Sequence, residues 1–310
     1  MRRTAEFDAF GPWIFEVTSP EEVPPLYRSH RLDLESAELV LKVPRRIWRR
    51  EANPDMDLYD HLLVAGPAAL TVLTRKGDGY ETVEVPYRRT AAIASSVSLL
   101  DGRFLVYDVE GSQANGVAIN VRYNSVSHDL IERLVGVLRA KVREVSPAGP
   151  TSETPPHTEH GPLALRDLGE DDVALVTEQR ELAHHDDQVV PAATHQRTTV
   201  QRRTGTMPKV LDMLRPVTLH AAIVCVSPGQ LHVLHRQQWF SVGKRPVHSV
   251  AHTVIVIPQV TAVEVNDVKR YASARSVRVT SGRAVIELPF PSSAETGAAI
   301  VNALGTVPKR

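Results

Sequence analysis

Cysteine is nearly missing from this 310-residue chain, which contains only Cys225. A single cysteine excludes an intrachain disulfide and any metal cluster that several cysteines would hold. Cys225 lies in the apolar run "AAIVCV". We expect a buried strand position there, because a free cysteine usually behaves as a small core hydrophobe.

The chain also lacks a long hydrophobic run and an excess of charge of either sign. No stretch approaches the roughly 18 apolar residues of a membrane-spanning helix, and "MRRTAEFDAFGPWIF" has no uninterrupted apolar segment of a signal peptide. Lys+Arg and Asp+Glu both number 36, so any binding to nucleic acid or membranes would need a local patch. We therefore expect a globular cytoplasmic protein with no nucleic-acid partner, with membrane association as the alternative.

The common motifs of catalysis are missing as well. The sequence has no Gly-x-Ser-x-Gly turn, no phosphate-binding P-loop and no dinucleotide-binding glycine loop. Acidic pairs at 21–22 and 171–172 lie where helices are expected to begin, and carboxylates there complement the helix dipole. We predict a protein that is not an enzyme and uses no cofactor.

Proline is concentrated in one segment, "SPAGPTSETPPHTEHGP" at 146–162. Proline removes backbone donors and stiffens the chain, so the segment is typical of a linker. The predicted organisation is a first domain at 1–143 with an N-terminal extension, a linker at 144–162 and a second domain at 163–310.

The two halves repeat one another. "LLVAGPAALTVLTR" and "IVCVSPGQLHVLHR" match in the placement of a proline, a leucine and an arginine. Each half opens with an acidic pair and a short helical pattern, "EEVPPLYRSHRL" and "DDVALVTEQREL". Each ends with a strand followed by an amphipathic helix, "VAINVRYNSVSHDLIERLVGVL" and "AVIELPFPSSAETGAAIVNAL".

Alternating hydrophobicity predicts about seven strands in the first half. They lie near 37–43, 60–65, 69–75, 81–87, 90–97, 102–109 and 116–123. The helix that follows places apolar residues on one face, namely Val126, Leu130, Ile131, Leu134, Leu138 and Val142. In the second half, Ser292 and Glu295 form a predicted capping box. The predicted fold class is α+β and mostly β, with two small antiparallel barrels of about seven strands, each closed by a C-terminal helix.

"VPYRRTAAIASSVSLLDGRFLVYD" followed by "VAINVRYNSVSHDLIERLVGVLRAKV" resembles bacterial pleckstrin-homology-like domains, present here as two tandem copies. The resemblance covers most of both halves apart from the linker and the first dozen residues. It rests on hydrophobic patterns and turns. It implies a binding and assembly fold without catalysis, similar to oligomerising bacterial modules of unknown ligand.

Histidines supply weak metal candidates. "LAHHDD" brings together His184, His185 and Asp187, which are suitable ligand types, but adjacent histidines point in different directions and a solvated loop is favoured. His232 and His235 should project to opposite faces of a strand. His248 and His252 lack an evident third ligand, so no metal site is predicted.

A basic segment, "LKVPRRIWRRE", gives the strongest functional signal. It surrounds Trp48 with five cations: Lys42, Arg45, Arg46, Arg49 and Arg50. Arginine suits phosphate and tryptophan suits a membrane interface. In the pleckstrin-homology fold, this position resembles the loop where lipid-binding members collect phosphate-gripping side chains. The alternative is a solvated charge run with a core tryptophan, since the matching "PAATHQRTTVQRR" has no tryptophan.

The second half carries a longer loop, "QQWFSVGKRPVHSVAH". Its Trp239, Phe240, Lys244 and Arg245 are candidate protein contacts, because aromatics and arginine dominate interface energetics. The alternative is that both rings fold back onto the domain. The predicted function is a binding or scaffolding protein whose partner is another protein or a second copy of the chain, joined through exposed strand edges. A peripheral membrane protein that binds anionic lipid, and a metal-dependent enzyme, are the alternatives.

Overall fold

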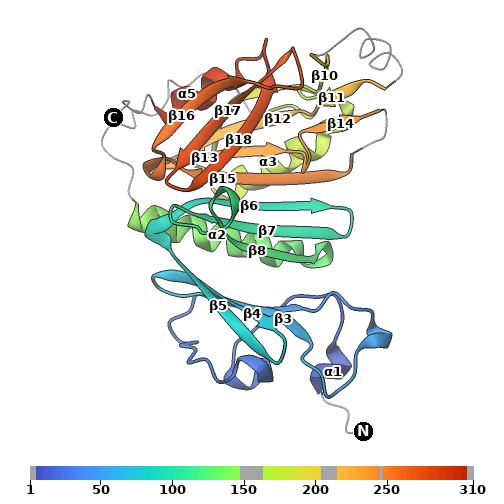
Figure 1. The fold of residues 1–310 in the computed structure, drawn as a ribbon, viewed down its shortest axis with the longest axis vertical. Helices are drawn as coiled ribbons and strands as arrows, with labels where there is room; N and C mark the ends of the chain where they lie inside the picture. Colours follow the sequence, from blue (N-terminus) through green and yellow to red (C-terminus); the bar gives the residue numbers. More distant parts are fainter. Residues whose placement is uncertain (1–4, 147–162, 204–214, 244–246, 306–310) are drawn as a thin grey trace.

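The computed structural model describes residues 5–146, 163–203, 215–243 and 247–305. In Figure 1 the first half of the chain lies below and the second half above. The predicted linker falls almost entirely outside the described residues, apart from 144–146, which close the last helix of the first half.

The first half begins with a short helix, α1 (Ala5–Ala9), and ends with a long one, α2 (His128–Val145). Its strands are β1 (Phe15–Glu16), β2 (Leu39–Pro44), β3 (Tyr59–Ala65), β4 (Ala69–Lys76), β5 (Gly79–Pro86), β6 (Thr90–Ser98), β7 (Asp101–Asp108) and β8 (Val117–Asn124). All seven strands predicted in this half are present, within a few residues of the expected bounds. The alternation of apolar residues and the turn residues was sufficient to locate them.

The second half opens with α3 (Val173–His185) and closes with α5 (Thr296–Leu304). Its strands are β9 (Val190–His195), β10 (Thr198–Val200), β11 (Val217–Leu219), β12 (Ala222–Ser227), β13 (Gln230–His235), β14 (Phe240–Val242), β15 (Ser249–Val256), β16 (Ala262–Asp267), β17 (Ala274–Ser281) and β18 (Ala284–Pro291). The order of the main elements parallels the first half. A 3₁₀ turn follows β5 (Tyr87–Arg89) and another follows β15 (Ile257–Gln259).

The described strands form four antiparallel sheets. One has the order β1-β2-β3-β4-β5, one the order β10-β11-β14 and one the order β16-β17-β18. The largest has the order β8-β7-β6-β15-β13-β12-β9 and contains strands of both halves. Its central pair joins β6 to β15, from Ala92 opposite Ile255 to Ser98 opposite Ser249.

The predicted class, mostly β with antiparallel sheets, is confirmed, whereas the predicted closed barrels are wrong. The described sheets stay open. In each half, the strand after the 3₁₀ turn belongs to a different sheet from the strand before it, so the first sheet is not closed. The edge of β6 pairs instead with β15 of the other half. Hydrogen bonding between the halves therefore replaces the closure that the pattern of strands predicted.

The core of the first half lies on α2. This helix buries Ile131, Leu134, Leu138 and Val142 against both the five-stranded sheet and the strands β6–β8. Each such leucine, fully buried, contributes roughly 2 kcal/mol through the apolar surface it removes from water. Val126, predicted on this face, instead lies before the helix and is exposed.

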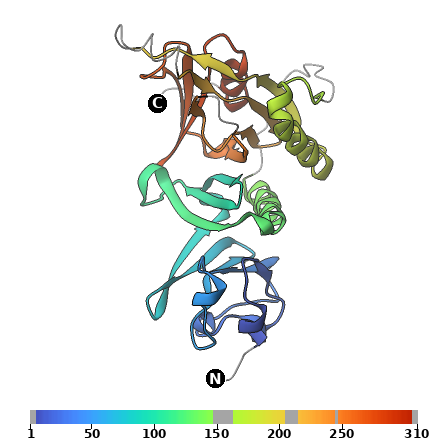
Figure 2. The ribbon, with the colours of Figure 1, turned by 90° about the vertical axis from the view of Figure 1, so that its right-hand side faces the viewer.

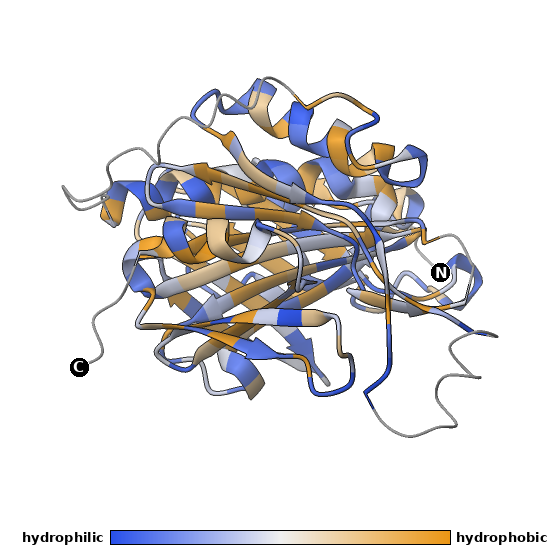
Figure 3. Cartoon of the chain, turned by 90° about the horizontal axis from the view of Figure 1, so that it is seen from above, coloured by the Kyte–Doolittle hydropathy of each residue, from blue (hydrophilic) through white to orange (hydrophobic). Residues whose placement is uncertain are grey.

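The seven-stranded sheet is covered on both faces. The helices α2 and α3 lie on one face, where α3 packs on β12 and β13. The sheet β16-β17-β18 and α5 cover the other face, on the core of Val224, Leu231 and Ile255. In Figure 3 the hydrophobic colours are concentrated in these strands and on the inner sides of the helices. Cys225 is buried on the α3 side, as predicted.

Two predicted helix starts differ in the structure. The segment at Glu21 forms only two short 3₁₀ turns (Pro20–Glu22 and Pro25–Tyr27), because Pro24 and Pro25 interrupt a helix, whereas the matching segment at Asp171 continues into α3. The predicted capping box at Ser292 is wrong, since α5 begins at Thr296 with Glu295 before it.

Candidate functional site

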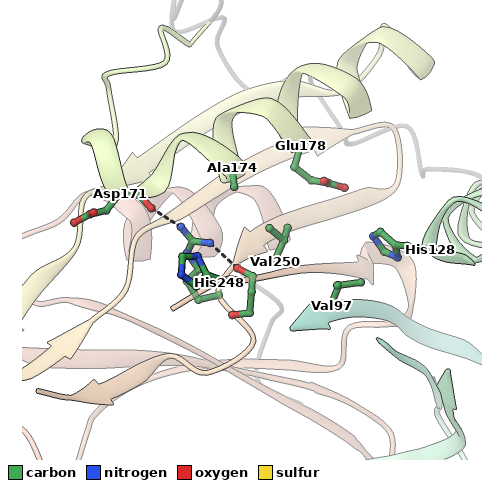
Figure 4. Close-up of a pocket in the computed structure, with 9 residues that line it drawn as sticks. Val97, His128, Asp171, Ala174, Glu178, His248 and Val250 are labelled. Carbon is green, nitrogen blue, oxygen red and sulfur yellow. Dashed lines mark hydrogen bonds between the residues drawn. The ribbon is translucent and has the colours of Figure 1, made fainter. Parts of the chain in front are cut away.

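A cavity of about 370 Å³ lies where the two halves meet. It is bounded by α3 on one side, by the paired strands β6 and β15 beneath, and by the first residue of α2 (Figure 4). Its lining is Val97, His128, Asp171, Ala174, Glu178, Arg236, His248, Ser249 and Val250. The cavity exists only because β6 and β15 pair, since those strands supply its floor.

One end of the cavity is closed by a saturated ion pair. Arg236 is buried and donates to the carboxylate of Asp172 through Nε (3.0 Å) and Nη2 (2.8 Å). It also donates to the backbone oxygens of Asp171 (2.6 Å) and Ser249 (2.7 Å). Arg197 Nε donates to the other oxygen of Asp172 at 2.9 Å. The charges at this end therefore compensate one another.

The other end carries titratable groups without such compensation. Glu178 of α3 and His128 of α2 stand at this end in Figure 4, with Val97 and Val250 beneath them. Burial, followed by repulsion from Glu132, raises the pKa of Glu178 to about 7. No described residue forms a hydrogen bond or ion pair with its carboxyl group. Burial lowers the pKa of His128, so its imidazole is neutral near pH 7.

A second carboxyl group lies one turn along α2. Glu132 accepts a hydrogen bond from the Ser95 hydroxyl at 2.7 Å, and burial raises its pKa. The nearest cation candidate is His128, whose Nε2 is 3.7 Å from Glu132 and whose Nδ1 bonds the Tyr123 hydroxyl at 2.8 Å. This region of the cavity is therefore rich in acceptors and poor in cations.

Behind the cavity, a row of polar side chains crosses the sheet under the helices. His232 Nδ1 is 3.1 Å from His252 Nε2, and His232 Nε2 is 2.9 Å from the Ser227 hydroxyl. Burial lowers the pKa of His252 to about 3 and that of His232 well below its usual range. No carboxylate among the described residues bonds either ring, and all three side chains are buried. The row therefore lacks the acid and the access that nucleophilic catalysis requires.

Five exposed large apolar side chains lie on segments near the cavity, and we call them together the apolar rim. Its members and their exposed fractions are Trp13 (51%), Trp48 (70%), Leu99 (72%), Leu100 (66%) and Val126 (50%). Leu99 and Leu100 form the tip of the β6–β7 hairpin, which lies at the right of Figure 1 and faces the viewer in Figure 2.

Hydrogen bonds and an ion pair hold the segments that carry the apolar rim close to one another. The hydroxyl of Ser125, the neighbour of Val126, donates to the Leu99 oxygen at 2.6 Å. Ser127 Oγ accepts from the amide of Ile14, the neighbour of Trp13, at 2.9 Å. An ion pair between Arg46 and Asp101 holds the segment before Trp48 against the hairpin.

Leu99 also adopts an unfavourable backbone conformation, with φ at +53°. A bulky side chain in the left-handed region costs about 1 kcal/mol, and glycine or asparagine usually takes such positions. The chain thus exposes a leucine where a glycine would be both more polar and less strained.

The predicted basic segment is largely engaged within the protein. Lys42 Nζ donates to the backbone oxygen of Glu22 at 2.8 Å, and Arg45 Nη1 donates to the backbone oxygen of Asp57 at 3.2 Å. Arg46 pairs with Asp101, Arg49 donates to the backbone oxygens of Phe7 and Phe10, and Arg50 lies over the exposed ring of Trp48. Trp48 is not in the core, but four of the five cations already have protein partners.

The predicted aromatic contacts fold back onto the protein. Trp239 stacks on His235 with ring centroids 4.2 Å apart, and Phe240 stacks on Tyr271 at 4.6 Å. Both rings are partly buried against the cores of the second half. Lys244 and Arg245 lie outside the described residues. These contacts agree with the alternative prediction for this loop, in which both rings fold back onto the domain.

The weak metal candidates do not converge. His184 and His185 end α3 with their rings at 81° to one another, and His185 Nδ1 bonds the Glu181 oxygen at 2.7 Å. Asp187 follows in the turn. Nowhere in the described part of the chain do three or more His, Cys, Asp or Glu side chains group as a metal site would require. The neighbouring Asp186 instead binds Arg139 (2.7 Å) and Arg143 (2.9 Å) of α2.

Sequence reasoning did not identify Glu178, His128 or the leucine pair. Adjacent leucines directly before the Asp-Gly that begins β7 are a signal that could have been used, because turns seldom expose two large apolar side chains. Glu178 has no comparable signal, since its surroundings combine residues of both halves that are far apart in the sequence.

No protein-family model, no curated protein and no solved structure matches the chain. Among the described helices, none has both the length and the apolar character needed to cross a bilayer.

Proposed function

We propose that this protein is a non-catalytic binding protein that docks another protein on the apolar rim. The observation that carries the proposal is the gathering of five half-exposed or more exposed large apolar side chains around one hairpin tip. The strained Leu99 strengthens it, because folding stability alone would favour glycine at that position. Strain retained at an exposed apolar tip is typical of a contact surface.

The size of the apolar rim supports a protein contact. Its side chains expose on the order of 500 Å² of apolar surface, which lies in the range of functional patches on soluble proteins. A standard interface buries about 800 Å² on each partner, with an apolar centre and a polar border. Arg46, Arg122 and Asp101 stand beside the leucines and would supply that polar border.

Charge favours a protein partner over an anionic membrane. Arg46 and Arg122 both lie within 4 Å of Asp101, and Arg49 is bound to backbone oxygens. Lipid phosphates would have to compete with these contacts, and each free cation near an anionic surface contributes only about 1 kcal/mol. Tryptophan and arginine side by side are, in contrast, the residues that most often dominate protein interfaces.

The proposal includes a pleckstrin-homology-like plan for each half, used here for assembly. It is supported by the shared order of an antiparallel sheet, a 3₁₀ turn, three further strands and a helix. In this proposal neither half closes its own sheet, because β6 and β15 form hydrogen bonds with one another.

Site-specific photo-crosslinking would test the proposed function. Leu100 would be replaced by a benzophenone amino acid in cells that naturally produce the protein, and Thr82 on the exposed edge of β5 would serve as the control position. We expect discrete protein adducts from position 100 and none from position 82. Adding Leu99→Gly and Trp48→Ser should remove the adducts without unfolding the protein, because glycine relieves the backbone strain.

Other outcomes would contradict the proposal. Equal adducts at both positions would show that contact is not specific to the apolar rim. Lipid adducts at position 100, together with sedimentation on anionic vesicles that Arg50→Glu abolishes, would establish the membrane alternative instead.

A further inference from the structure

The mouth of the cavity adjoins the apolar rim. Val97 of the cavity floor lies two residues before Leu99, and His128 of its wall lies two residues after Val126. The Leu99 amide donates to the oxygen of His248, another lining residue, at 3.4 Å. A chain seated on the rim would therefore have a neighbouring side chain at the cavity mouth.

The interior of the cavity has two distinct chemical parts. Val97, Val250 and Ala174 supply apolar surface along its length. Arg236 at the closed end already donates four hydrogen bonds, to Asp172 and to two backbone oxygens, so Asp172 compensates its charge without a ligand. Glu178 at the open end has no hydrogen-bond or ion-pair partner among the described residues, and it is the one lining carboxylate left in that state.

We infer that this cavity receives an alkylammonium group, namely a lysine side chain of the partner that docks on the apolar rim. The inference rests on the proposed function and names the chemistry of its partner. The aliphatic stem would lie on Val97 and Val250, and the ammonium group would reach the carboxylate of Glu178. A partly buried carboxylate without a partner favours such a ligand, because an unpaired charge partly removed from water is costly.

The groups facing Glu178 agree with a cationic ligand. They are Glu132 and His128 of α2 and Glu181 of its own helix. The two carboxylates raise the pKa of Glu178, and His128 offsets part of this effect. A bound cation should lower the pKa of Glu178 from about 7, because an opposite charge nearby favours the ionised carboxylate.

Nuclear magnetic resonance with a matched pair of probes would test the inference. The first probe is Nα-acetyl-lysine N-methylamide, and the second is the norleucine analogue, which has the same stem without the ammonium group. We expect only the lysine probe to shift the methyl signals of Val97 and Val250. At saturation it should lower the pKa of Glu178 by about one unit, which corresponds to roughly tenfold tighter binding to the ionised carboxylate.

Two charge-removing variants make the test specific. Glu178→Gln should abolish the shifts caused by the lysine probe, whereas Glu170→Gln, an equal charge change at an exposed residue before α3, should preserve them. If Glu178→Gln does not fold, the unaltered protein gives the same information, because binding should weaken as the pH falls below about 7 and Glu178 is protonated.

The inference fails if norleucine shifts the same signals equally, or if the lysine probe binds independently of Glu178 and pH. Failure here with specific crosslinks at position 100 would overturn the lysine assignment alone. Loss of the crosslinks with intact lysine binding would overturn the proposed function but not the cation site.

Discussion

Two strand edges join the halves of this protein, and the two equivalent edges pair with no further strand in the part of the chain that the structure describes. β6 follows the 3₁₀ turn of the first half and pairs with β15, which precedes the 3₁₀ turn of the second. Their counterparts by position are β16 and β5, each of which ends its sheet. The same kind of junction could in principle form between β16 of one molecule and β5 of another.

Charge separates the joined edges from the free ones. The paired segments 92–98 and 249–255 contain no Asp, Glu, Lys or Arg. β5 carries Glu81 and Glu84, and β16 carries Glu264 and Asp267. Like charges facing one another disfavour strand pairing, and exposed edge strands commonly carry charge for this reason. The halves of one chain therefore pair along uncharged edges, whereas the charges on β5 and β16 disfavour the same pairing between two molecules.

The halves also differ in what they bury under their helices. His232 and His235 match Thr71 and Thr74 in the repeat, but the histidines are buried and the threonines are only partly so. As predicted, the two histidines project to opposite faces, since His232 bonds His252 while His235 bonds Thr253 and stacks on Trp239. The second half therefore contains most of the groups that should respond to acid.

The largest effect is expected from a charge placed inside the junction. Ala92→Glu would put a carboxylate at a fully buried position of β6, opposite Ile255. We expect a loss of about 4 kcal/mol or more in the free energy of unfolding, measured by chemical denaturation, because no cation is present to pair with it. Thr82→Glu on the free edge of β5 should change stability by less than about 0.5 kcal/mol. Equal losses of unfolding free energy in the two variants would refute the distinction between the joined edge and the free edge.

A smaller difference is expected between two matched arginines. Arg236 pairs with the fully buried Asp172, whereas its counterpart Arg75 pairs with the partly exposed Asp60 at 2.9 Å. Asp172→Asn should cost about 3 kcal/mol, because it leaves a buried guanidinium without its counter-charge. Asp60→Asn should cost under about 1 kcal/mol. Thermal and denaturant unfolding would measure both, and similar costs would contradict the role of burial.

Lowering the pH should destabilise the protein mainly through the buried histidines of the second half. The folded-state pKa of His252 is about 3, below the usual 6.5, so the unfolded chain binds more protons and stability falls as the pH drops from about 6.5 toward 3. Between pH 7 and pH 5 this single histidine should account for a loss of about 2 kcal/mol. The raised pKa of Glu178 acts in the opposite direction, so comparison with a variant is needed.

His252→Gln should flatten the fall in unfolding free energy between pH 7 and pH 5 by about that amount. Thr199→Ser, which alters an exposed side chain of the same half that carries no titratable group, should leave the pH dependence unchanged. A pH profile that is identical in all three proteins would exclude His252 as the acid-sensitive group.

The smallest effect concerns association through the free edges. The double variant Glu81→Thr and Glu84→Thr would make β5 as neutral as β15. We expect weak, concentration-dependent self-association in analytical ultracentrifugation, because a free neutral edge can accept a strand from another copy. Glu35→Thr with Glu181→Thr removes the same charge away from any strand edge and should leave the protein's behaviour unchanged. Association in both variants would attribute it to net charge instead.

By itself the sequence determined the local elements. Period-two alternation placed β2 through β8, and the stripe from Leu130 to Val142 placed α2, because these signals depend only on neighbouring residues. The proline-rich composition of 146–162 and the matching segments of the two halves were visible in the same way, and the linker stays a prediction. The prolines at 24 and 25 were also visible, and they should have excluded an opening helix in the first half.

Only the tertiary structure decided how the elements meet. Whether β6 closes its own sheet or pairs with β15 depends on edges that lie more than 150 residues apart, for which local patterns carry no information. The unpaired state of Glu178 and the burial of His252 follow from that pairing, since both take their surroundings from elements remote in the chain. Burial and charge compensation are properties of the assembled neighbourhood, so the cavity and its chemistry arise only once the two halves have joined.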